Sequence, residues 1–114
     1  MLTFRNDQIT EIRRIKDDKF VQKVQNFIKL NYPVRTSSLT EKEIDQSIRL
    51  GMKRAKAYNL LSEKSMLAFI ELMYTLTEDF DTNVNTRWTK SILSDSNLSE
   101  SQKLTSIINK LNGA

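Results

Sequence analysis

The chain has 114 residues, 39% of them hydrophobic, and a formal net charge of +4 at pH 7. This length suits one domain with a single core and leaves little room for a second lobe. Cysteine and histidine are both absent. Disulfides, thiolate nucleophiles and Cys-type zinc sites are therefore excluded, and so are the commonest metal ligand and the usual proton carrier at neutral pH.

The positive charge is concentrated in the first third of the chain. Residues 1–35 contain eight Lys or Arg against four Asp or Glu, whereas residues 36–114 contain ten of each kind. This excess is mild beside the dense basic clusters of nucleic-acid binders, so we interpret it as a solvated basic face.

Targeting and membrane segments are not evident. Residues 1–14 contain no apolar run of signal-peptide length, and no later segment approaches the roughly 20 apolar residues that a membrane span requires. We expect a cytoplasmic protein without a membrane partner. Export by a machine that needs no cleavable signal is compatible with the same sequence.

A long first helix is predicted by the apolar spacing and by the scarcity of breakers, two glycines and one proline. It should begin near Asn6 or Asp7 and end near Asn31, because Pro33 disfavours a helical residue before it. A loop to Thr40 should follow. The expected inward positions are Ile9, Ile12, Phe20, Val24, Phe27 and Ile28.

The next two helices should form an antiparallel pair. Thr40 and Glu43 have the spacing of a capping box, which predicts a helix from Glu41 to about Tyr58. Asn59 suits the left-handed conformation that closes a helix, and Ser62 should cap a third helix. This third helix, Glu63 to about Thr77, has apolar residues on more than one face and should be the most buried.

Two shorter helices should close one end of the molecule. A polar loop over residues 78–86 leads to a helix of about Arg87 to Leu93, which Trp88 should anchor to the core. Ser99 and Gln102 repeat the capping-box spacing before the last helix, which Gly113 ends. The predicted fold is an all-α, single-domain bundle of about five helices over residues 1–114, with the long first helix on the central pair.

The polar loop contains a partial calcium-binding pattern. Asp79, Asp81 and Asn83 alternate as the first three ligands of a calcium loop do. However, the sixth position is Val84 instead of glycine, and the twelfth is Lys90 instead of glutamate. Turn formation and capping by these side chains is the better interpretation, so we predict no metal and no cofactor.

The second helix also contains a cluster of cations that resembles a DNA-recognition helix. Its members are Arg49, Lys53, Arg54 and Lys56, with Tyr58 after them. Three acidic residues open the same helix and would repel phosphates, while the terminal cations suit the helix dipole. Nucleic-acid binding is therefore the weaker interpretation.

No arrangement typical of catalysis is present in the sequence. Carboxylates such as Glu63, Glu71 and Glu78 are not brought together by their spacing, and Ser or Thr nucleophiles have no histidine to activate them. We expect neither an enzyme nor a small-molecule substrate. Aromatic residues beside the polar loop are the better candidates for a protein-binding surface, and our candidate residues are Arg54, Tyr58, Phe80, Asp81 and Trp88.

Nearly the whole chain resembles a family of small, uncharacterised, all-helical proteins. The resemblance begins with Arg5-Asn6-Asp7-Gln8, Phe20 and Tyr32-Pro33. It continues through Gly51 to Ala55, Tyr58, Ser62-Glu63, Phe69-Ile70-Glu71-Leu72-Met73, Asp79-Phe80-Asp81, Trp88 and Ile92-Leu93. Members of this family are encoded beside type VI secretion spike and effector genes in Gram-negative bacteria. Where they typically have glycine after the helix-ending tyrosine, this chain has Asn59.

The resemblance implies an accessory role in contact-dependent bacterial competition. Such a protein would act as an adaptor or chaperone that binds an effector or a spike component and holds it for delivery. An immunity protein that neutralises a cognate toxin is the alternative, and a small DNA-binding regulator is a weaker one. In the first two cases the partner is a protein.

Overall fold

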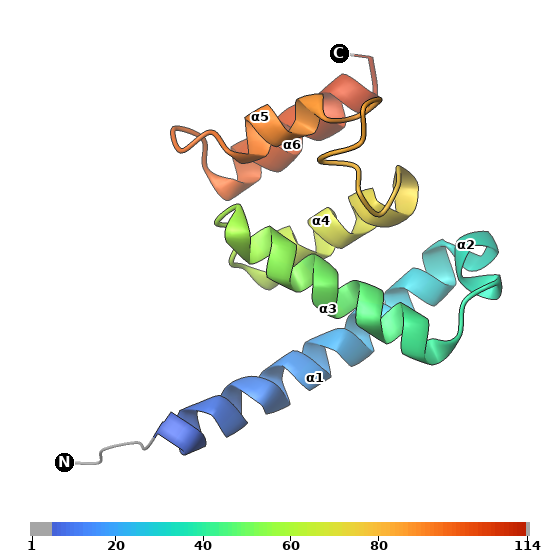
Figure 1. The fold of residues 1–114 in the computed structure, drawn as a ribbon, viewed down its shortest axis with the longest axis vertical. Helices are drawn as coiled ribbons and strands as arrows, with labels where there is room; N and C mark the ends of the chain where they lie inside the picture. Colours follow the sequence, from blue (N-terminus) through green and yellow to red (C-terminus); the bar gives the residue numbers. More distant parts are fainter. Residues whose placement is uncertain (1–5, 114) are drawn as a thin grey trace.

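Two helices connected by a tight turn, α3 (Glu41–Ala57) and α4 (Glu63–Thr75), form the centre of the molecule (Figure 1). The computed structural model describes the backbone of residues 6–113 and the side chains of residues 16–113. The capping box of Thr40 and Glu43 is confirmed, with both reciprocal hydrogen bonds present. Asn59 has φ 62° in the turn, so the predicted left-handed residue is also confirmed.

The other helices lie on either side of this pair. Helix α1 (Asn6–Asn31) runs across it on one side, while α5 (Trp88–Leu93) and α6 (Glu100–Leu111) lie side by side at the opposite end (Figure 1). Helix α1 is continuous through the adjacent aspartates 17 and 18, which therefore do not interrupt it. The all-α fold and the arrangement of the long first helix on a central pair are confirmed.

Helix α2 (Pro33–Ser37) differs from the expected loop and brings the helix count for residues 6–113 to six. Pro33 ends α1 as predicted, because Tyr32 leaves the helical region with φ −130° and ψ 55°. The same proline then occupies the first turn of α2, where its missing amide is not needed and its fixed φ suits a helix. The Arg35 guanidinium donates to the Leu76 carbonyl oxygen at 2.7 Å and so ties α2 to the end of α4.

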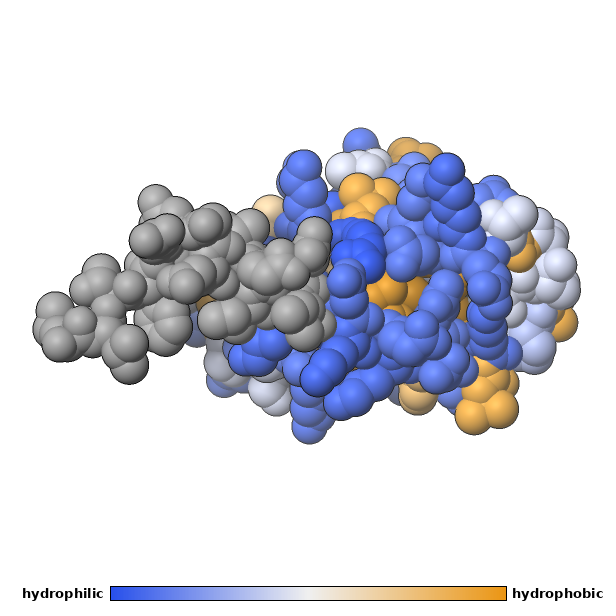
Figure 2. Space-filling model, turned by 90° about the horizontal axis from the view of Figure 1, so that it is seen from below, coloured by the Kyte–Doolittle hydropathy of each residue, from blue (hydrophilic) through white to orange (hydrophobic). Residues whose placement is uncertain are grey.

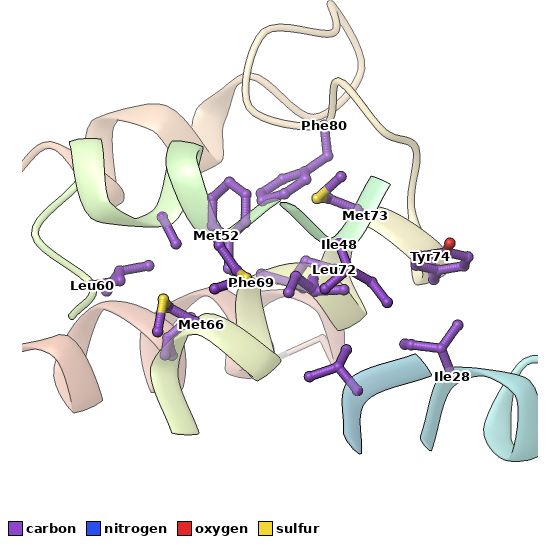
Figure 3. Packing of buried hydrophobic residues seen from close by; sticks show 14 of the residues in the cluster. Ile28, Ile48, Met52, Leu60, Met66, Phe69, Leu72, Met73, Tyr74 and Phe80 are labelled. Carbon is purple, nitrogen blue, oxygen red and sulfur yellow. The ribbon is translucent and has the colours of Figure 1, made fainter. Parts of the chain in front are cut away.

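The hydrophobic core is centred on α4, as predicted (Figure 3). Phe69 and Ile70 are fully buried, and they contribute to a core that includes Ile28 of α1 and Ile48 of α3. Phe20, Val24 and Ile28 are confirmed as inward positions of α1, whereas Phe27 is only half-buried. The side chains of Ile9 and Ile12 lie outside the described residues.

Close contact between α3 and α4 depends on Gly51. A Cβ atom at this position would lie 2.6 Å from Cγ1 of Ile70 and 2.9 Å from Sδ of Met73. Both distances are shorter than ordinary van der Waals contact, so a larger residue would force the two helices or their side chains apart.

Polar side chains of α6 fasten this helix to the turn between α3 and α4. The Glu100 carboxylate accepts hydrogen bonds from the backbone amides of Leu61 and Ser62, the latter at 3.0 Å. Lys103 is buried, and its ammonium group donates a hydrogen bond to the Tyr58 carbonyl oxygen at 2.8 Å. These three bonds use backbone groups near the end of α3 and the start of α4, where the helices leave amides and carbonyls without partners.

Candidate functional site

Arg54, Tyr58 and Asp81 form one hydrogen-bonded network between α3 and the loop that follows α4. The Asp81 carboxylate forms an ion pair with the Arg54 guanidinium and accepts a hydrogen bond from the Tyr58 hydroxyl at 2.6 Å. The guanidinium also donates to the carbonyl oxygen of Glu78. Asp81 is only 5% exposed, so its carboxylate oxygens have little access to water. Each of them has a hydrogen-bond partner within the protein instead.

Aromatic rings enclose the guanidinium group on its other side. The Cζ atom of Arg54 lies 5.2 Å from the ring centre of Phe69 and 5.9 Å from that of Phe80. The two phenyl rings are themselves 5.0 Å apart and tilted by 55°. A guanidinium over aromatic faces gains an electrostatic attraction that strengthens away from water, so the rings fix Arg54 in position.

The ionisation of Tyr58 is strongly affected by this environment. Burial of the phenol, and then its hydrogen bond to the Asp81 carboxylate, raise the pKa of Tyr58 from 10.0 to about 12. The neutral hydroxyl donor is thus maintained over the whole physiological pH range.

The loop between α4 and α5 is held to the body of the protein through this network. Phe80 is fully buried, and its carbonyl oxygen accepts a hydrogen bond from the Thr86 hydroxyl at 2.6 Å. The buried Thr89 hydroxyl donates in turn to the Thr86 carbonyl oxygen at 2.9 Å. These bonds give a loop without regular secondary structure a fixed path.

The aspartates of the partial calcium pattern have different partners. Asp81 faces Arg54 and Tyr58 of α3, while Asp79 accepts from the Thr77 hydroxyl at 2.9 Å within its own turn. The hydrogen bond from Thr77 lowers the pKa of the Asp79 carboxyl group. The predicted role in turn formation is therefore confirmed for Asp79. Among the residues described, no group of three or more acidic side chains is placed to hold a metal ion.

An open depression of about 770 Å³ lies beside the network, where the loop meets α5. We call it the Trp88 surface; it is lined by Asp81, Thr82, Val84, Arg87, Trp88, Lys90, Ser91 and Ser94. Val84 is 71% exposed, and Trp88 is half-buried against the core with the Lys110 ammonium 5.5 Å from its ring centre. The depression thus combines apolar side chains with a basic rim.

The structure brings four of the five predicted binding residues into one cluster, and Asp81 connects this cluster to the surface that contains the fifth, Trp88. Phe80, one of the predicted binding residues, is fully buried, and its ring packs against Phe69 and Arg54 in the core. Tyr58 and Trp88 are half-buried. Arg54 and Asp81 therefore stabilise the loop, and the exposed part of the site is formed by their neighbours.

Of the eight residues that line the Trp88 surface, sequence reasoning predicted Asp81 and Trp88 and missed the other six, among them the exposed Val84 and Arg87. Val84 does not fit the calcium pattern, but a valine in a run of Asp, Asn and Thr is itself a signal of an apolar position in the loop. Among the cations of the DNA-recognition interpretation, Arg49 is paired with Asp18 and Asp45, and Arg54 with Asp81. Two of its four cations are thus engaged by carboxylates.

Comparisons with known proteins identified no relative of this chain. No protein-family model, no curated protein and no solved structure matches it. Within residues 6–113, no helix is both long enough and apolar enough to span a bilayer.

Proposed function

We propose that this chain is a non-enzymatic accessory protein that binds another protein through the Trp88 surface. In keeping with the family resemblance, the partner would be an effector or spike component of a type VI secretion system. The chain would act as an adaptor or chaperone for it in the cytoplasm. The observation that carries the proposal is a hollowed surface formed by exposed Val84 of the loop and half-buried Trp88 of α5, beside Asp81, which holds the loop in place.

Composition and rigidity both support a protein partner at this surface. Trp and Arg are the side chains most enriched at the energetic centres of protein interfaces, and Trp88 and Arg87 line the depression. A segment that is already ordered loses little conformational entropy when it binds. The network of Arg54, Tyr58 and Asp81 provides this order before any partner arrives.

The test is complex formation with the product of a neighbouring gene. The tagged chain, expressed together with each adjacent gene, should recover one product in a stoichiometric complex. The double variant Val84→Asp with Arg87→Glu should weaken that complex at least tenfold, which corresponds to about 1.4 kcal/mol.

A matched control distinguishes a local effect from a change in charge. Val34 is 85% exposed on α2 and Lys42 is exposed on α3, both away from the Trp88 surface. Val34→Asp with Lys42→Glu changes the net charge by the same amount and should leave the complex intact. Equal weakening by both double variants, or recovery of no neighbouring product, would count against the proposal.

An activity assay on the same purified complex distinguishes an adaptor from an immunity protein. If the partner is a toxin and the chain abolishes its activity in a stoichiometric assay, the role is neutralisation. If the toxin stays active in the complex, the role is holding or delivery. Tight, sequence-dependent binding of duplex DNA by the free chain would instead support a regulator.

A further inference from the structure

A second hollow lies between α1 and the first half of α4, away from the Trp88 surface. It has a volume of about 330 Å³, and its floor is formed by Phe20, Val24 and Phe27 of α1 with Leu67 of α4. We call it the α1–α4 groove. Figure 1 shows α1 and α5 toward opposite ends of the long axis, and the groove shares no lining residue with the Trp88 surface.

The floor of this groove is apolar and reaches the solvent. Phe20 and Val24 are buried, but Phe27 and Leu67 are only half-buried although both pack against the core. Figure 2 views the molecule from the α1 side and shows apolar surface recessed between projecting hydrophilic side chains. The volume is at the lower end of the roughly 300 to 1,000 Å³ typical of binding pockets.

Cations dominate the rim of the groove. Lys23 and Lys64 line it, are exposed and form no ion pair with any described residue, while Glu63 is the only acidic residue among the lining residues that the structure describes. Lys16 precedes Phe20 by four residues, and Lys23 precedes Phe27 by four, so helical geometry places them along one side of α1. The described residues that line the groove, two lysines and one glutamate, therefore carry a net charge of +1.

We propose that the α1–α4 groove binds an acidic amphipathic helix of a protein partner. Such a helix would insert apolar side chains spaced at i, i+3 or i+4, and i+7 into the groove, and its flanking carboxylates would face Lys23 and Lys64. A second copy of this chain fits poorly, because its corresponding helix carries the same basic excess. The proposal rests on the proposed function only in that the chain acts by binding proteins.

The probe is a fluorescein-labelled synthetic helix with leucines at these spacings and glutamates beside them. Its binding is measured by anisotropy, with a matched peptide that carries lysines instead of glutamates. The glutamate peptide should bind, and NMR peak shifts should be concentrated in residues 20–27 and 63–67. Absence of binding, equal binding of both peptides, or shifts elsewhere would overturn the proposal, as would dimerisation of the free chain through this face.

Charge reversal provides the decisive comparison. The double variant Lys23→Glu with Lys64→Glu should bind the glutamate peptide at least tenfold more weakly than the wild type. It should also bind the lysine peptide, which the wild type does not. Lys53→Glu with Lys56→Glu, at exposed positions of α3, should change neither affinity by more than about twofold. An equal loss in both double variants would overturn the proposal, because it would indicate attraction by net charge alone.

The Val84→Asp with Arg87→Glu variant distinguishes this inference from the proposed function. It should bind the glutamate peptide normally even though it loses the complex with a neighbouring gene product. If the peptide fails to bind but that complex forms, only the groove proposal fails. If the peptide binds and no neighbouring product is recovered, only the proposed function fails.

Discussion

Asp81 is a buried charged residue, so its replacement should lower the stability of the folded protein. Its side chain is 7% exposed, and that of its partner Arg54 is 21% exposed. In Asp81→Asn the guanidinium would remain among Phe69 and Phe80 without its counter-charge. Loss of one partner of a buried pair costs about 3 to 5 kcal/mol, and partial exposure of Arg54 favours the lower value. Urea unfolding should show a stability loss of about 3 kcal/mol.

A surface ion pair of the same type is the control for Asp81→Asn. Asp45 contacts Arg49 at 3.0 Å, but their side chains are 36% and 43% exposed. Asp45→Asn should therefore cost no more than about 1 kcal/mol. If the two variants lose equal stability, the burial argument for Asp81 is wrong.

Tyr58 should make stability depend on alkaline pH. Its pKa is raised to about 12 in the folded protein from 10.0, so the neutral phenol is favoured by folding. The resulting stabilisation is fully present below pH 10 and is lost as pH rises through 12. The wild type should lose more stability than Tyr58→Phe over this interval. Parallel curves for the two proteins, measured by urea unfolding, would contradict the assignment.

Local polar patterns were predictable from the sequence, whereas long-range polar contacts were not. The capping boxes at Thr40 and Ser99 follow from a three-residue spacing, and both are present. The pairing of Arg54 with Asp81 joins residues 27 positions apart. It depends on where the loop after α4 crosses α3, and no local pattern specifies that crossing.

At the scale of elements, Gly51 controls the contact between α3 and α4. Gly51→Ala would gain about 1 kcal/mol in helix propensity, but its Cβ would meet Ile70 and Met73 well within contact distance. Overpacking of this kind costs about 1 to 3 kcal/mol. We expect a net loss of about 1 kcal/mol, measured by thermal unfolding.

An exposed position on the same helix serves as the control. Lys53 is exposed on α3, and Lys53→Ala should stay within about 0.5 kcal/mol of the wild type. A Gly51→Ala protein more stable than the wild type would show that Ile70 and Met73 move aside without cost.

Glu100 should couple the attachment of α6 to acidic pH. Hydrogen bonds from the Ser62 and Leu61 amides lower the pKa of Glu100 below its ordinary 4.5. A depressed pKa means that the stabilisation is present above pH 4.5 and disappears as pH falls through the folded value. Glu100→Gln should flatten the acid limb of the stability curve measured by circular dichroism. An unchanged acid limb would show that this carboxylate does not hold α6 in place.

The long helices were predictable to within about two residues because their caps and apolar spacing agree. Helix α2 was not predicted, because five residues are too few to show the repeat of apolar residues that marks a helix. Pro33 is also equally compatible with the end of one helix and the first turn of the next. Phe27 and Leu67 share the apolar spacing of core residues. Their half-burial depends on how closely α1 approaches α4, which sequence alone does not specify.

At the scale of the whole molecule, the fold separates two surfaces of different character. Helices α3 and α4 form the centre, with α5 and α6 toward one end and α1 toward the other (Figure 1). The Trp88 surface includes residues of α5, and the α1–α4 groove includes residues of α1. An adaptor needs two such surfaces to connect two proteins, whereas an immunity protein needs one. Simultaneous occupation would therefore favour the adaptor role.

Hydrogen exchange on the complex with the neighbouring gene product tests whether the Trp88 surface binds the partner. Partner binding should slow amide exchange in residues 82–94, which contain most of the Trp88 surface, and should leave α2 unchanged. Protection confined to other segments, with residues 82–94 exchanging as in the free chain, would contradict it.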